Sequence, residues 1–335
     1  MRKKIMRSRG GVAVIATVVT VSTLIAPPSY AEEQGAAADA VADLVQTAAA
    51  EATASQDAIP GILTADATVA LPRDPDANVI VGLQEDPVLE ISLPDAVDLH
   101  TGVESSDGMM VFAGKGDSPD VTVEALPSGA RVTTVIKGDT AGRSFDYVLP
   151  DGVTAELRSD GRVELTEQIE VEVDKGEVEV SKIVGYVEPA WAIDAAGRDV
   201  PTSYEIEDGV LTQHVQTDSA TTYPVVADPQ WSVTSWNHAR MRWNRAETAT
   251  ISAGGWGATG AAGACGLVGS ALAGPPGAAI GSAACLAAGG AAVYTAGVAQ
   301  NSRPQRCLEM YATVIFTIQP SFLPWFGTYS GGSCR

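Results

Sequence analysis

The sequence predicts an α+β protein. We expect an antiparallel all-β body, either a sandwich or a meander, followed by a small Gly/Ala-rich tail that forms a disulfide-stapled helical hairpin. Three observations support this prediction. Short Val- and Ile-rich runs alternate with turns such as Asp-Gly between residues 78 and 231. Residues 248–302 contain no Asp, Glu, Lys, Arg or His. All four cysteines lie in the last 71 residues.

The N-terminus is typical of a secretory signal peptide. A basic segment, 1–9, precedes an apolar run, 11–26, and the small residues Ser29 and Ala31 follow at the spacing that a signal peptidase recognises. The apolar run is shorter than the roughly 20 residues that span a bilayer. We therefore expect residues 1–31 to be removed and the mature protein to be secreted and extracellular. A retained membrane anchor is the alternative.

Charge is distributed unevenly along the chain. Residues 32–231 hold 39 acidic and 10 basic residues, whereas residues 232–335 hold six basic and two acidic ones. The acidic body is predicted to repel nucleic acid and anionic lipid. The cationic tail allows contact with a membrane or the cell envelope, or electrostatic docking of tail and body on each other. No cofactor is expected.

Residues 32–77 are predicted to be an Ala-rich leader and linker. Apolar residues spaced three and four apart between Val41 and Ala48 fit one face of a short amphipathic helix, and a mobile leader is the alternative. Prolines and a glycine punctuate residues 57–75, which favours a linker there.

Residues 78–231 are predicted to form the acidic β-rich domain. The clearest hairpin spans residues 163–184, in which Val and Ile alternate with Glu on both sides of an Asp-Lys-Gly turn. This alternation places four glutamates on one face. They form either a solvated face that keeps the sheet from aggregating or a site for a cation or a basic partner.

The body ends in the segment Tyr-Pro-Val-Val-Ala-Asp-Pro, residues 223–229. This segment resembles one found in uncharacterised secreted actinobacterial proteins, in which an acidic β-rich body is followed by a short cysteine-containing tail. The resemblance implies a domain boundary near Asp228 and Pro229. It implies no activity.

No catalytic arrangement is present in the sequence. It contains no G-x-S-x-G, no H-E-x-x-H, no P-loop and no G-x-G-x-x-G that follows a predicted strand. The three histidines, His100, His214 and His238, are far apart and lack a paired nucleophile. We therefore expect a protein that is not an enzyme.

The cysteines are predicted to form two disulfides, because their number is even, the chain is exported and no C-x-x-C pair suggests a metal site. Cys265 lies nine residues before Gly274 of a Gly-Pro-Pro-Gly turn, and Cys285 lies eight residues after it ends. Both cysteines lie on rows of small residues at four-residue spacing, which lets two helices approach closely. We predict Cys265–Cys285 and Cys307–Cys334, and the other two connectivities remain open.

The tail, residues 232–335, is predicted to start with a helix over 236–251 that has a capping box at Asn244 and Glu247. Aromatic residues interleaved with arginine suit an anionic membrane interface or a partner, and the alternative is a packing helix with solvated arginines. Seven residues are candidates for such contact: Trp236, Arg240, Arg242, Trp243, Arg245, Trp325 and Phe326.

Two functions follow from these features. The first is a secreted, non-catalytic binding or structural protein of the cell exterior with a disulfide-stapled C-terminal mini-domain. The alternative is a membrane-active, bacteriocin-like or envelope-inserting hairpin that is restrained by the acidic body.

Overall fold

The computed structural model describes eight stretches of the chain: residues 30–53, 66–83, 86–173, 176–234, 238–255, 258–315, 321–332 and 334–335. The helices are α1 (Tyr30–Thr53), α2 (Arg245–Thr250) and α3 (Ala258–Asn301), with a π-helical turn at Ile251–Gly255. The strands of the body are β1 (Ala67–Ala70), β2 (Val79–Leu83), β3 (Asp86–Ile91), β4 (Val103–Glu104), β5 (Met110–Phe112), β6 (Asp120–Leu126), β7 (Gly129–Ile136), β8 (Ser144–Val148), β9 (Val153–Leu157), β10 (Val163–Val173), β11 (Gly176–Val187), β12 (Ala192–Asp194), β13 (Thr202–Glu207), β14 (Val210–Val215), β15 (Val225–Ala227) and β16 (Gln230–Val233). The strands of the tail are β17 (His238–Arg242), β18 (Cys307–Ile315) and β19 (Ser321–Tyr329).

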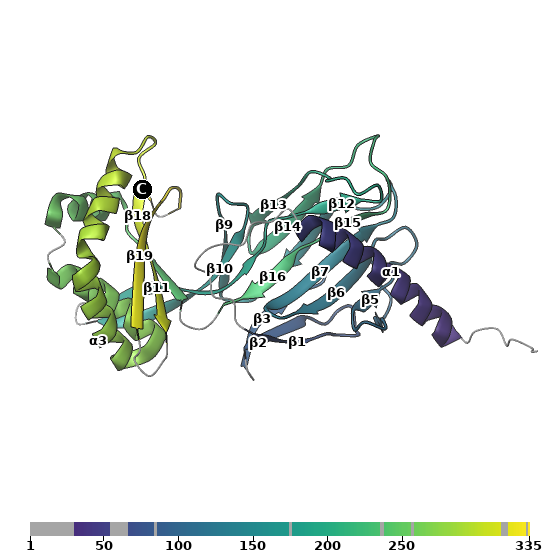
Figure 1. The fold of residues 1–335 in the computed structure, drawn as a ribbon, viewed down its shortest axis with the longest axis horizontal. Coiled ribbons are helices and arrows are strands. Elements are labelled where there is room, and N and C mark those ends of the chain that lie inside the picture. Colours follow the sequence, from purple (N-terminus) through teal and green to yellow (C-terminus); the bar gives the residue numbers. More distant parts are fainter. Residues whose placement is uncertain are drawn as a thin grey trace, which may run out of the picture.

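The α+β prediction is confirmed. All strand pairs in the described residues are antiparallel, and a helical hairpin and two disulfides lie in the tail. Figure 1 shows the body and the tail as two masses joined by long strands. The predicted signal peptide lies outside the described residues, except for Tyr30 and Ala31, which begin α1.

The body has three layers. In its middle layer, β16, β7, β6, β5 and β4 lie side by side. Helix α1 covers one face, where its buried Ala and Val side chains contact Val111, Val135 and Trp191. Side chains of the small sheets β1-β2-β3 and β13-β14-β8 pack on the other face. Strand β7 is therefore buried along its whole length. The body is a sandwich, with a helix on its outer face.

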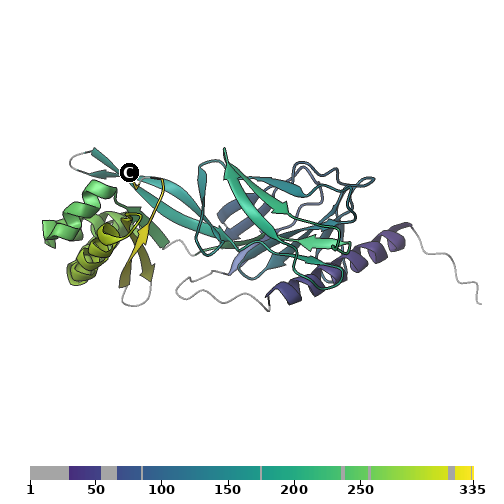
Figure 2. The ribbon, with the colours of Figure 1, turned by 90° about the horizontal axis from the view of Figure 1, so that it is seen from above.

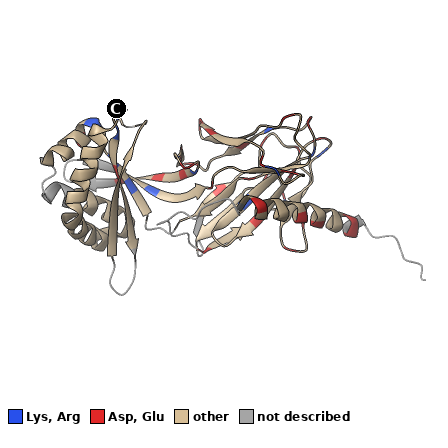
Figure 3. Cartoon of the chain, turned by 45° about the horizontal axis from the view of Figure 1, so that its top comes forward, with Lys and Arg blue, Asp and Glu red and all other residues tan. Residues whose placement is uncertain are grey.

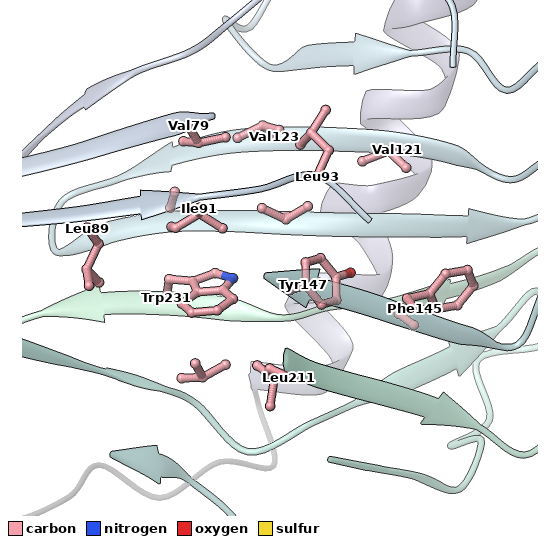
Figure 4. Packing of buried hydrophobic residues seen from close by; sticks show 14 of the residues in the cluster. Val79, Leu89, Ile91, Leu93, Val121, Val123, Phe145, Tyr147, Leu211 and Trp231 are labelled. Carbon is pink, nitrogen blue, oxygen red and sulfur yellow. The ribbon is translucent and has the colours of Figure 1, made fainter. Parts of the chain in front are cut away.

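Large side chains fill the space between the sheets. Trp231 and Tyr147 meet edge to face, with ring centroids 6.3 Å apart, an arrangement that aromatic rings favour. Phe145 and Leu211 pack near them from β8 and β14 (Figure 4). This core holds the body together by burying apolar surface.

Two expected boundaries differ from the structure. Ala67–Ala70 was expected in a linker, but it forms β1 and pairs with β2. Four residues are too few for an alternation of side chains to distinguish a strand from a linker. The body was expected to end at residue 231, but β16 continues to Val233 and lies between β11 and β7. The amphipathic helix expected around Val41 and Ala48 is present as part of α1, and it packs on the body.

The predicted hairpin of residues 163–184 is confirmed as β10–β11. Its register pairs Ile169 with Val180 and Glu170 with Glu179, as the alternation requires. The C-terminal end of β11, from Gly185 to Val187, pairs with β16 in the body. The middle of β11, at Ser181 and Lys182, pairs with β17 in the tail. Strand β11 therefore runs continuously from body to tail (Figure 2).

Candidate functional site: the tail domain and its joint with the body

The tail is organised around a hairpin formed by α3. Its first arm, 258–272, and second arm, 275–301, meet at Ala273 and Gly274, whose backbone angles are not helical. Gly274 has a φ of 61°, which glycine adopts at little cost. Pro275 follows at the start of the second arm, where a proline removes no helical hydrogen bond. The Gly-Pro-Pro-Gly sequence therefore ends one helix and begins the next, as predicted.

The predicted disulfides are both present. Cys265 and Cys285 join the two arms, with Cα atoms 5.9 Å apart, and both side chains are fully buried. Cys307 at the start of β18 is bonded to Cys334 near the C-terminus, with Cα atoms 5.6 Å apart. The spacing argument thus gave the right connectivity.

Glycines allow the arms to approach closely. A Cβ atom built on Gly281 would overlap the carbonyl oxygen of Cys265, and one built on Gly269 would overlap the carbonyl oxygen of Gly277. These residues belong to the small-residue rows identified in the sequence. Glycine is required at these positions because the two backbones touch there.

One face of the sheet β17-β18-β19 supports the hairpin. Met241, Met310 and Phe322 project from its three strands into a cluster with Cys265 and Cys285. The tail is therefore a two-layer unit, in which a helical hairpin packs on a sheet.

The start of the tail differs from the prediction. A helix was expected over 236–251, but His238–Arg242 is strand β17, and the helix α2 spans only Arg245–Thr250. Ala239 and Met241 face the hairpin, whereas Arg240 faces the opposite side, which is the period of a strand. The capping box is confirmed: Asn244 Oδ1 accepts the N–H of Glu247 at 2.9 Å, and Glu247 Oε2 accepts the N–H of Asn244 at 2.8 Å.

On the other face of this sheet, a buried ion pair joins the tail to the body. Arg240 on β17 is 5% exposed and Glu164 on β10 is 2% exposed. Arg240 Nη1 donates to Glu164 Oε1, and the hydroxyl of Tyr311 on β18 donates to Glu164 Oε2 at 3.2 Å. Arg240 Nη1 also lies 3.3 Å from Glu156 Oε2. The carboxylate of Glu164 thus has a partner on each oxygen, as a buried charge requires.

Further ion pairs surround this contact. Arg242 Nη2 donates to Glu156 Oε1 at 2.7 Å, and Arg242 Nε donates to Glu309 Oε2 at 3.1 Å. Arg158 Nη2 donates to the other oxygen of Glu309 at 3.3 Å. The joint therefore contains three arginines and three glutamates, contributed by β9, β10, β17, β18 and the residue that follows β9. In Figure 3, blue and red segments alternate at this joint.

The arginines change the acidity of Glu156. Burial opposes the ionisation of this carboxyl, whereas the hydrogen bond and charge of Arg242 favour it. The charges of Arg240 and Arg158 act in the same direction. The pKa of Glu156 is therefore held below its usual value of 4.5.

The candidate contact residues do not gather on one surface. Trp236 lies outside the described residues. Arg240 and Arg242 bind carboxylates, and Trp243 is 8% exposed, so these three do not present a cationic aromatic face to a membrane. Arg245 is exposed on α2.

The two candidates on β19 are separated as well. Trp325 is 42% exposed and stacks on Tyr311, with ring centroids 5.5 Å apart. Phe326 is half-buried and packs against the hairpin cluster on the opposite face.

An exposed, uncharged stripe runs along the second arm of α3. Leu286 is 55% exposed, Tyr294 75% and Val298 48%. The stripe consists of Ala279, Ala283, Leu286, Ala287, Gly290, Ala291, Tyr294 and Val298. These positions recur at helical spacing along one side of the arm, opposite the buried row of Gly277, Gly281 and Cys285. In Figure 3 the hairpin is almost entirely tan.

The ion pairs of the joint were not predicted from the sequence. The exposed stripe was not predicted either, although the helical spacing of the sequence contains it. The partners of Arg240 and Arg242 come from distant strands, and no local pattern marks Glu156, Glu164 or Glu309. The stripe, in contrast, is the helical face left over once the cysteine row is assigned to the interior of the hairpin.

The three histidines do not come together in the described residues. His238 is buried beside Thr313 Oγ1, 2.9 Å from its Nδ1, and burial lowers its pKa. His214 lies between Ser144 and Glu205 on the body surface. Across the described stretches, no group of three or more His, Cys, Asp or Glu side chains is placed to hold a metal ion.

Comparison with known proteins does not identify a family. No family model matches the chain, and no curated protein is similar to it. One solved structure, that of the GH92 family glycosyl hydrolase CcMan5, matches with 11% identity and a TM-score of 0.17. The match covers 51% of this chain and 30% of the hydrolase. A similarity this low shows neither a shared fold nor a shared activity.

Proposed function

We propose that the chain is a secreted, non-catalytic binding or structural protein of the cell exterior, and that its tail is the binding module. The observation that carries this proposal is the exposed, uncharged stripe on the second arm of α3. Apolar patches of this kind on a folded domain mark interaction sites more often than chance exposure does. Leu286, Tyr294 and Val298 supply its larger side chains.

The construction of the tail supports a binding role. Two disulfides fix the hairpin and the C-terminus, and the ion pairs of the joint fix β17 and β18 against the body. The stripe is thus presented on a rigid frame, which lowers the entropic cost of binding. The disulfides are also compatible with an extracellular location, since they persist outside the cytoplasm.

The test uses the mature, oxidised protein and isolated cell-wall fragments in a co-sedimentation assay. Val298→Lys places a charge in the stripe. Val148→Lys places one at a valine of similar exposure, 45% against 48%, on the body. We expect Val298→Lys to weaken sedimentation at least tenfold and Val148→Lys to leave it unchanged. Equal effects of the two substitutions, or no sedimentation of the unsubstituted protein, would contradict the proposal.

A second candidate function is membrane insertion of the hairpin. The observation in its favour is that Gly263–Asn301 is long and apolar enough to cross a membrane, with only 22% of its most apolar window buried. For insertion, the two helical arms would have to separate from the sheet β17-β18-β19 while they remain joined by the Cys265–Cys285 disulfide. Dye leakage from anionic liposomes on addition of the full oxidised chain would favour this candidate, whereas intact liposomes together with wall binding would favour the first.

A further inference from the structure

A pocket lies on the body, far in sequence from the tail, between α1 and the middle sheet. Its volume is about 760 Å³. Ala37, Ala38 and Val41 of α1 form one wall, and Val103 and Val111 of β4 and β5 lie on the other. Pockets that hold small organic ligands have volumes of about 300–1,000 Å³ and mostly apolar walls. The size and lining of this pocket suit such a ligand.

Basic and polar groups also line the pocket. Arg73, His100 and Lys137 line it, and Asp120 is the one acidic residue among the lining residues. Asp120 is 9% exposed, and its Oδ1 accepts from Lys137 Nζ at 2.6 Å and from the N–H of Gly114 at 2.7 Å. The charge of Asp120 is thus balanced within the protein.

Arg73 adds an available positive charge. It lies 3.2 Å from Glu104, but the two side chains are 66% and 54% exposed, so this pair is solvated and weak. The guanidinium retains donors for an incoming anion, because an arginine carries five N–H groups.

The charge of this pocket contrasts with that of two other pockets of the body. One other pocket is lined by Glu90, Asp151 and Glu167, without a basic residue. Another is lined by three aspartates and a single lysine, Lys115. The α1 pocket therefore combines an apolar wall with two basic side chains in a strongly acidic body.

We propose that the pocket between α1 and the sheet binds a small amphipathic carboxylate, with the carboxylate at Arg73 and Lys137 and the apolar chain along Ala37 and Val41. The two basic side chains attract the head group, and the α1 wall removes the chain from water. This binding is independent of the stripe on α3 and goes beyond the proposed role of the tail.

The experiment is calorimetric titration of the full mature protein with octanoate, with octylammonium as the probe of opposite charge. The first variant, Arg73→Gln with Lys137→Gln, removes both cations. The second, Ala37→Phe, fills the pocket from an exposed position on α1. The control, Lys115→Gln, removes an exposed lysine that does not line this pocket. Circular dichroism of each variant verifies its fold.

We expect saturable binding of octanoate, no binding of octylammonium, and unchanged affinity in Lys115→Gln. The double variant and Ala37→Phe should each weaken binding at least tenfold. Should the double variant fail to fold, Ala37→Phe still decides the question, because its wall position leaves the Lys137–Asp120 pair intact. Absence of octanoate binding, equal binding of octylammonium, or unchanged affinity in folded Ala37→Phe would overturn the proposal.

Discussion

The body and the tail bury their interiors in different ways. The body places large side chains such as Trp231, Tyr147 and Phe112 between layers, and no disulfide crosses its core. The hairpin of the tail buries mainly Ala, Gly and Cys, which remove less apolar surface from water per residue. Close backbone approach and the Cys265–Cys285 disulfide take the place of bulky side chains there. A region of small residues thus acquires a defined shape through geometry and cross-links.

The two regions also use charge differently. Glu124, Glu167 and Glu205 of the body form pairs that retain solvent exposure. At the joint, Arg240 and Glu164 are almost fully buried. Surface pairs contribute about 0–1 kcal/mol, whereas removal of one partner from a buried pair costs about 3–5 kcal/mol. Loss of a single charge at the joint should therefore cost more than loss of one from these exposed pairs.

The largest expected effect is at this joint. Arg240→Met leaves Glu164 buried without its ionic partner and should lower the free energy of unfolding of the tail by about 3–5 kcal/mol. Glu167→Gln, which removes a half-exposed pair with Lys182, should cost at most about 1 kcal/mol. Hydrogen exchange of β17 and β18 measures both effects.

A double variant, Arg240→Met with Glu164→Leu, sharpens this prediction. Replacing both charges by apolar groups should recover most of the lost stability, because no unpaired charge remains buried. If Arg240→Met behaves like Glu167→Gln, the ion pair does not hold the tail to the body.

The second prediction concerns backbone contact in the hairpin. Gly281→Ala forces a methyl group onto the carbonyl of Cys265 and should destabilise the tail by about 1–3 kcal/mol, the usual cost of overpacking. Gly290→Ala adds a methyl group in open space within the same helix and should stabilise it by about 0.5–1 kcal/mol. Thermal unfolding of the oxidised protein compares the two. Effects of the same sign would show that the arms are not in contact.

The third and smallest effect is the pH dependence of the two regions. The pKa of Glu156 is lowered in the folded protein, so its contribution is present above pH 4.5 and is lost as the pH falls through its folded pKa. The effect is small because the side chain is 37% exposed. We expect the tail to lose hydrogen-exchange protection as the pH falls below 4.5, and Glu156→Gln to reduce this loss.

The contribution of Asp228, in the body, to stability should change with pH in the opposite direction. Burial raises its pKa well above 3.8, against the hydrogen bond from the N–H of Trp191 and the charge of Arg131. Its folded state holds a proton that the unfolded state releases, so its contribution to stability falls as the pH rises above 3.8. Asp228→Asn should therefore become more stable than the unsubstituted protein as the pH rises. If the unfolding midpoints of Asp228→Asn and of the unsubstituted protein change with pH in the same way, the prediction is contradicted.

Local patterns predicted the elements whose partners are close in the chain. The alternation around residues 163–184 specified β10–β11 and its register, and the spacing of Cys265 and Cys285 from the Gly-Pro-Pro-Gly turn specified the hairpin and its disulfide. In both cases the turn itself fixes which residues meet.

Contacts between distant segments were not predictable from pattern. Arg240 and Glu164 are 76 residues apart, and nothing near either residue marks the other. The strand β17 was expected as a helix, because the Arg residues within it and the Trp residues that flank it fit helical as well as strand spacing over so short a run. Its conformation is determined by pairing with β11 and β18.

The central claim is that the uncharged hairpin is a folded, sheet-supported module before it meets any partner. Hydrogen exchange of residues 263–301 in the oxidised, full-length protein in water, without and with anionic liposomes, tests it most directly. The account predicts protection of both arms comparable to that of β18 in water alone, unchanged by liposomes and weakened by reduction of the disulfides. Rapid exchange in water, with protection that appears only when liposomes are added, would contradict it.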